Sequence, residues 1–226
     1  MRSRAAAARE MNEVAYRGWF RSDVDPMELL RAFPALRLKD GYVLRAYRWY
    51  DSGNGGGRVW IMPHGAAFPD PTRSPWRWPR GMLLLPPKPA QADADVMRFI
   101  EGDGSALSYL SASLFARDLS EFGAMWHREY WSTCTVIGED PWQKPQTSES
   151  WWPSSDRLRW RWREPEPANW SPTVEFHGNY VKVILRIYCG CGNESLVESI
   201  DVYKRGGYSF KRRERILGYG PISAMF

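Results

Sequence analysis

Long apolar segments are missing from this sequence of 226 residues. The apolar run at residues 82–85 stops at Pro86, whereas a membrane-spanning helix needs about 20 apolar residues. Residues 1–10 also lack the hydrophobic stretch of a secretory signal, and we expect them to form a frayed leader. The sequence therefore predicts no membrane partner.

Cysteine is scarce, with Cys134, Cys189 and Cys191 as the three residues of this type. So few cysteines without an export signal favour a reducing compartment, and we expect a cytoplasmic protein with no disulfide framework. Cys189 and Cys191 could offer two thiolates to zinc, but a strong zinc signal pairs two Cys-x-x-Cys knuckles. We therefore predict no metal and no cofactor.

Motifs that would assign a function are also absent. The sequence contains no RNP-type segment, no KH loop and no helix-turn-helix pattern. The glycine-rich residues 51–57 lack the Gly-Lys-Ser/Thr of a phosphate loop and precede a strand pattern, so we interpret them as a flexible hairpin tip. The remaining evidence on function is composition and the spacing of charged and aromatic residues.

Tryptophan and positive charge are abundant, with 13 Trp and a net charge of +5 at pH 7. Hydrophobic content of 43% and charged content of 25% are those of a globular protein. The length allows one large domain, and we expect a single α+β domain over residues 11–226. A net positive charge favours acidic partners such as nucleic acid, although a net charge of this size is also common in proteins that need it only for solubility.

The elements we expect follow from hydrophobic periodicity and turn residues. Strands are expected at 14–21, 42–50 and 58–62, the last two as a hairpin, with a short helix opened by Asp25 and Pro26. Pro- and Trp-rich loops are expected at about 63–92 and 138–156. A long amphipathic helix at about 105–128 is predicted from apolar residues at helical spacing, which include Leu107, Leu110, Leu114, Phe115, Leu119, Phe122 and Trp126. The predicted fold class is α+β, a mostly antiparallel sheet from N- and C-terminal strands with this helix packed on one face.

The C-terminal third alternates apolar and polar residues, which is typical of strands. Pairing Leu185 with Ile200 and Val183 with Val202 keeps both apolar sets on one face. For the next turn we prefer Phe210 opposite Val202, because the other register sets Lys211 and Arg213 opposite apolar residues. This arrangement predicts an open face with the cations Lys182, Arg186, Lys211, Arg213 and Arg215.

Residues 157–163 alternate arginine with Leu158, Trp160 and Trp162. In a strand, Arg157, Arg159, Arg161 and Arg163 would share one face about 6 to 7 Å apart, close to the phosphate spacing of an extended nucleic acid. Arginine also binds phosphate through two parallel hydrogen bonds. The alternative is an edge strand with Leu158, Trp160 and Trp162 in the core and the arginines merely solvated.

These observations favour a non-catalytic binding or assembly protein with a basic, Trp-laced surface that engages RNA, a nucleic-acid single strand or a nucleoprotein partner. An acidic protein is a further partner that such a surface could bind. The candidate contact residues are Arg157, Arg159, Arg161, Arg163, Lys211, Arg213, Arg215, Trp160 and Trp162. One alternative is a small enzyme that uses His64 or His127 with a nearby carboxylate. Another is a structural or protein-interaction module whose Trp-rich loops cover a partner.

Overall fold

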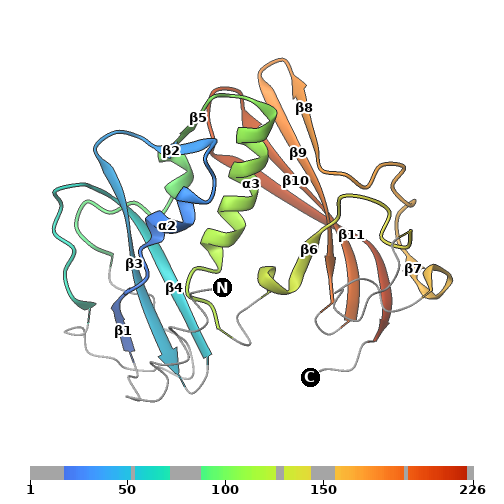
Figure 1. Ribbon diagram of the computed structural model, residues 1–226, viewed down its shortest axis with the longest axis horizontal. Coiled ribbons are helices and arrows are strands. Elements are labelled where there is room, and N and C mark those ends of the chain that lie inside the picture. The colour runs from blue at the N-terminus through green and yellow to red at the C-terminus, as the bar shows by residue number, and fades with distance from the viewer. Residues whose placement is uncertain are drawn as a thin grey trace. The chain divides into compact units, whose positions relative to one another are not determined.

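The chain forms two compact units in the computed structural model (Figure 1). The structure describes residues 18–51, 54–71, 88–125, 130–143, 156–190 and 193–222. One unit comprises residues 1–101 and 115–129, and the other comprises residues 102–114 and 130–226. The predicted leader, His127, and most of the two predicted loops lie outside the described residues.

The first unit is built on a three-stranded antiparallel sheet in the order β1-β3-β4. Its strands are β1 (Gly18–Arg21), β3 (Tyr42–Asp51) and β4 (Asn54–Pro63), and the predicted hairpin of β3 with β4 is confirmed. Helix α2 (Pro26–Arg31) begins where predicted, because the Asp25 side chain accepts a hydrogen bond from the Met27 amide at 2.9 Å. The short strands β2 (Leu36–Leu38) and β5 (Ile100–Gly102) pair with each other.

Our interpretation of the glycine-rich segment as a flexible tip was wrong for Gly55, Gly56 and Gly57, which lie inside β4. The indole of Trp49 lies against Gly56, and a Cβ at Gly57 would collide with the backbone oxygen of Phe122. The glycines are packing positions, because they let neighbouring groups approach the backbone closely. One face of the sheet forms an aromatic core from Trp19, Tyr47, Trp49, Trp60 and Met62.

The second unit contains a six-stranded antiparallel sheet in the order β6-β9-β10-β11-β7, with β8 paired to β9. The strands are β6 (Cys134–Val136), β7 (Arg161–Trp162), β8 (Thr173–His177), β9 (Tyr180–Cys189), β10 (Asn193–Lys204) and β11 (Phe210–Ile222). Val181, Val183 and Leu185 of β9 are fully buried. They define the buried face of the sheet.

Helix α3 (Ala106–Ser120) is shorter than the predicted helix at 105–128. The division between the two units falls within it, after Leu114. Leu107, which we assigned to the buried side, is 62% exposed, whereas Tyr109 and Phe115 are fully buried. Within the second unit the Ser113 hydroxyl bonds the Tyr203 hydroxyl at 2.7 Å. Val96–Phe99 forms a 3-10 helix that is followed by β5.

The predicted registers of the C-terminal strands were wrong. Leu185 pairs with Ser199, and Ile200 pairs with Ile184, one residue away from the predicted register. Val202 and Ile200 pair with Lys211 and Arg213, which is the arrangement that we rejected.

The physical reason is that β10 turns Ser199, Asp201 and Tyr203 toward the buried face, where all three are fully buried. Asp201 binds Arg212 at 2.7 Å and Ser199 donates to Glu214 at 3.0 Å. Because these polar groups have partners, they can occupy positions that an apolar match would have filled. Ile200 and Val202 lie on the opposite face, so the neighbouring cations do not enter the core.

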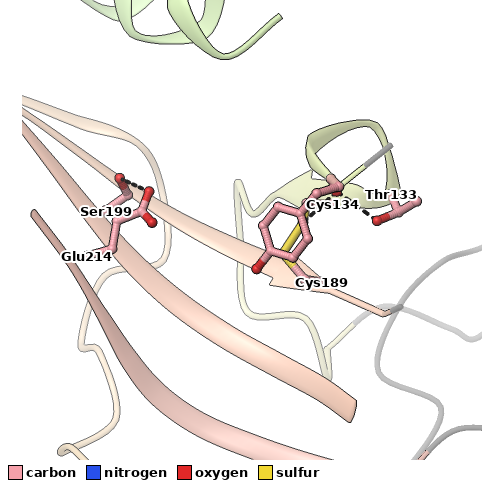
Figure 2. Close-up of a disulfide and its surroundings, with 6 residues drawn as sticks. Thr133, Cys134, Cys189, Ser199 and Glu214 are labelled. Carbon is pink, nitrogen blue, oxygen red and sulfur yellow. Dashed lines mark hydrogen bonds between the residues drawn. A yellow bond between two sulfur atoms is a disulfide. The ribbon is translucent and has the colours of Figure 1, made fainter. Parts of the chain in front are cut away.

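The expectation of no disulfide was also wrong, since Cys134 and Cys189 form one (Figure 2). Strands β6 and β9 make these cysteines cross-strand partners, with Cα atoms 4.2 Å apart. The bond removes our argument for a reducing compartment, and Cys189 is not available as a thiolate for zinc. Cys191 lies outside the described residues. Over the described ranges, no helix combines the length and apolar character needed to cross a bilayer.

Candidate functional site

The arginine-rich residues 157–163 do not form the predicted seven-residue strand. Arg157–Arg159 is a 3-10 helix, and only Arg161–Trp162 pairs as β7. The turn forms because the Asp156 side chain accepts a hydrogen bond from the Leu158 amide at 3.0 Å. Leu158, predicted to face the core, is 90% exposed. The continuous arginine face is therefore absent.

The tryptophans of this segment belong to an aromatic cluster on the second unit. Trp160 is 5% exposed, and its ring centroid lies 5.4 Å from that of Trp142 and 6.3 Å from that of Trp162. Trp170 and Tyr188 complete the cluster. Because Trp160 is covered by other rings, it has no free face to stack on a base.

The four arginines have different surroundings. Arg157 pairs with Asp140 at 3.2 Å and with Glu166, and it lies over the Trp142 ring. Arg159 and Arg161 are exposed. Arg163 is exposed as well, with its guanidinium over the Tyr219 ring.

Strand pairing places Arg161 on the side of the sheet that does not carry Lys211 and Arg213, and Arg163 contacts the ring of Tyr219 on that same side. Trp162 and Leu196 both pair with Gly218, so these residues share a face, and Arg161 pairs with Tyr219 on the other. Leu196 is six residues before Val202, so it lies on the same face as the partners of Lys211 and Arg213. Arg161 and Arg163 therefore do not share a surface with Lys211 and Arg213.

The five cations predicted on the open face do share one face of β9, β10 and β11. Lys182, Val202 and Lys211 form one row across the three strands, and Ile184, Ile200 and Arg213 form the next. Arg186, Glu198 and Arg215 form a third row. This face is the one opposite the buried Val181, Val183 and Leu185.

Two of these cations serve the sheet itself. Glu198 is 6% exposed and binds Arg186 at 3.2 Å and Arg215 at 2.8 Å. Arg215 also lies 3.3 Å from Glu164. These arginines compensate a buried carboxylate, so their charge is not free for a ligand.

The remaining cations define what we call the basic face: Lys182, Lys204, Lys211 and Arg213. Lys204, which sequence reasoning missed, follows Val202 on the same side of β10 and pairs with Tyr180. Lys204, Lys211 and Arg213 are exposed, and within the described part of the chain they form no ion pair. The alternation of β10 beyond Val202 was the signal that could have identified Lys204.

Glu175 on β8 is the acidic neighbour of this face, since it pairs with Lys182. A hydrogen bond from His177 at 2.9 Å, helped by the charges of His177 and Lys182, holds the pKa of the Glu175 carboxyl below its usual value. The negative charge lies on β8, whereas Lys211 and Arg213 lie on β11. The face is therefore polarised across the strands.

Of the two histidines considered for catalysis, His127 lies outside the described residues. His64 is exposed in the first unit, and His177 is exposed in the second. No group of three or more His, Cys, Asp or Glu side chains within the described ranges could hold a metal.

Comparison with known proteins gives no further assignment. No protein-family model, curated protein or solved structure matches the chain.

Proposed function

We propose that this protein binds nucleic acid without catalysing a reaction, through the basic face of its second unit. The observation that carries the proposal is the exposure of Lys204, Lys211 and Arg213 on one side of the sheet with no ion pair among the described residues. Lys182, half-exposed, extends the face onto β9. Unpaired cations on one surface attract a polyanion, since each phosphate they neutralise releases a bound counterion.

The geometry favours this candidate over an aromatic arginine ladder at residues 157–163. Arg157 is engaged by Asp140 and Glu166, and Trp160 is buried. On β11, by contrast, Lys211 and Arg213 are two residues apart on the same side. Such residues lie about 7 Å apart along a strand, which suits successive phosphates of an extended chain.

Fluorescence anisotropy with a labelled single strand of about 16 nucleotides tests the proposal. Four phosphate contacts on a single strand give a log–log salt slope of about −2.8, or roughly a fifty-fold loss of affinity between 50 and 200 mM salt. The double variant Lys211→Glu with Arg213→Glu should weaken binding strongly and reduce the magnitude of this slope by about 1.4.

The matched control is Arg161→Glu with Arg163→Glu, which makes the same change of charge: Arg161 pairs with Tyr219 on the other side of the sheet, and Arg163 contacts the Tyr219 ring. We expect this control to bind nearly as well as the wild type. Equal losses in the two variants would show that only net charge matters, and no binding at low salt would refute the proposed function.

A further inference from the structure

Two exposed rings lie at one end of the basic face. His177 on β8 and Tyr180 on β9 are cross-strand partners, and Tyr180 pairs in turn with Lys204 on β10. Tyr180 is 58% exposed, and the side chain of His177 is 54% exposed. Phe176, next to His177, contacts the Tyr109 ring, and Val181, next to Tyr180, is fully buried. Because neighbouring residues in a strand point to opposite faces, His177 and Tyr180 lie on the open face.

The rings lie on β8 and β9, and the cations of the basic face lie on β9, β10 and β11. Glu175 and His177 lie on β8, Tyr180 lies on β9, and Lys211 and Arg213 lie on β11. Ile184, Ile200 and Val202, all half-exposed, form an apolar strip between them. All four cations attract phosphates, whereas Glu175 repels them. A nucleic acid whose backbone follows Lys211 and Arg213 on β11 would extend its bases toward the apolar strip and the two rings.

Bases in a single strand are free to stack on protein rings, whereas bases in a duplex already stack on one another. Exposed aromatic side chains on the face of an antiparallel sheet are a general means of holding such bases. The hydrogen bond between His177 and Glu175, 2.9 Å long, fixes the orientation of the imidazole next to Tyr180.

We propose that Tyr180 and His177 form a base-stacking site, so that the ligand of the basic face is single-stranded nucleic acid. This inference rests on the proposed function, since the cations supply most of the affinity. Tyr180 contributes contact with the face of a base and does not select its sequence, because every base offers a π-face.

The experiment compares Tyr180→Ala and Tyr180→Phe on three probes of equal length: a base-bearing single strand, an abasic single strand and a duplex. Tyr180→Ala should weaken binding of the base-bearing strand about ten-fold without changing its salt slope, and Tyr180→Phe should bind like the wild type. The abasic strand should bind more weakly than the base-bearing strand and be insensitive to Tyr180→Ala.

Phe176→Ala is the matched control, because Phe176 belongs to the same hairpin, is 44% exposed and lies on the other face. It should leave binding of the base-bearing strand unchanged. Thermal unfolding of each variant checks that the fold is retained, and the exposure of Tyr180 makes its replacement harmless to the core.

Three results would overturn the stacking site alone: equal affinity of the wild type for abasic and base-bearing strands, an equal loss with Phe176→Ala, or a duplex bound as tightly as the single strand. Absence of binding to every probe at low salt would overturn the proposed function together with this site. The two failures are distinguishable. If the wild type binds with the expected salt slope but Tyr180→Ala changes nothing, the stacking site fails and the proposed function stands.

Discussion

Carboxylates on β10 hold arginines on both sides of the sheet. Asp201, fully buried, binds Arg212 at 2.7 Å, and Glu198 binds Arg186 and Arg215. A buried carboxylate without a partner would be costly, so these arginines are needed as counter-charges. Arg215, which the sequence predicted as a ligand contact, therefore stabilises the fold by pairing with Glu198.

Tyr188 should make the protein sensitive to alkaline pH. Burial, and secondarily the carboxylate of Glu194, raise the pKa of Tyr188 above its usual value of 10.0. The folded state therefore holds the phenol proton more tightly than the unfolded state. The resulting stability is complete below pH 10 and is lost as the pH rises above the unfolded pKa, by at most about 1.4 kcal/mol per pH unit.

Urea unfolding of Tyr188→Phe between neutral pH and pH 11 measures this effect. The variant should lose stability less steeply than the wild type above pH 10, whatever its stability at neutral pH. Parallel curves for the two proteins would contradict the prediction.

Gly57→Ala should destabilise the first unit, because the added Cβ meets the backbone oxygen and ring of Phe122. Backbone at this position must shift, and overpacking of this kind costs about 1 to 3 kcal/mol. Chemical denaturation followed by tryptophan fluorescence gives the change. Gly65→Ala, with nothing within 4 Å of the added Cβ, should change stability by less than about 0.5 kcal/mol. Similar values for the two variants would mean that Gly57 is not a packing position.

At the scale of elements, the arginine-rich segment shows why alternation alone does not make a strand. The seven residues fit the strand period, yet the Asp156 cap and the bond from the Trp160 amide to the Arg157 carbonyl close a 3-10 turn. Local hydrogen bonds of this kind compete with strand pairing. The pairing partner available on β11 extends to only two residues of the segment, Arg161 and Trp162.

The Cys134–Cys189 disulfide joins β6 to β9 across a sequence separation of 55 residues. Because it limits the unfolded chain over this loop, its removal by Cys134→Ala with Cys189→Ala should lower the free energy of unfolding by about 2 to 4 kcal/mol. Denaturant titration with and without a reducing agent measures the loss.

The control is Cys191→Ala, which leaves this pair intact and should keep the sensitivity to reduction. Thiol titration of the unfolded, unreduced wild type should find one free thiol among the three cysteines. Three free thiols in air-purified protein would contradict the pairing.

At the scale of the whole molecule, composition overstates the charge available to a partner. Ion pairs within the first unit engage Arg48 with Asp23 at 2.7 Å and Arg37 with Glu101 at 2.9 Å. In the second unit, Arg157, Arg186, Arg212 and Arg215 are all paired. Among the described residues, ion pairing therefore commits part of the positive charge to the fold, so the net charge of +5 does not measure how many cations a partner could reach.

The sequence by itself determined the sheet-rich character of the chain, the cap of α2 at Asp25, the β3–β4 hairpin and the alternation that sets Lys211 and Arg213 on one side of their strand. These features depend on local period and turn chemistry, which act over a few residues. Tertiary structure decided the register of β10, the Cys134–Cys189 bond, the closing of the arginine run into a turn and the burial of Trp160. Each of these depends on a partner distant in sequence or on competition between local and cross-strand hydrogen bonds. Arg212, which lies opposite Asp201, offsets the cost of burying this carboxylate. The apolar pattern of one strand cannot predict such a partner, because the partner belongs to another strand.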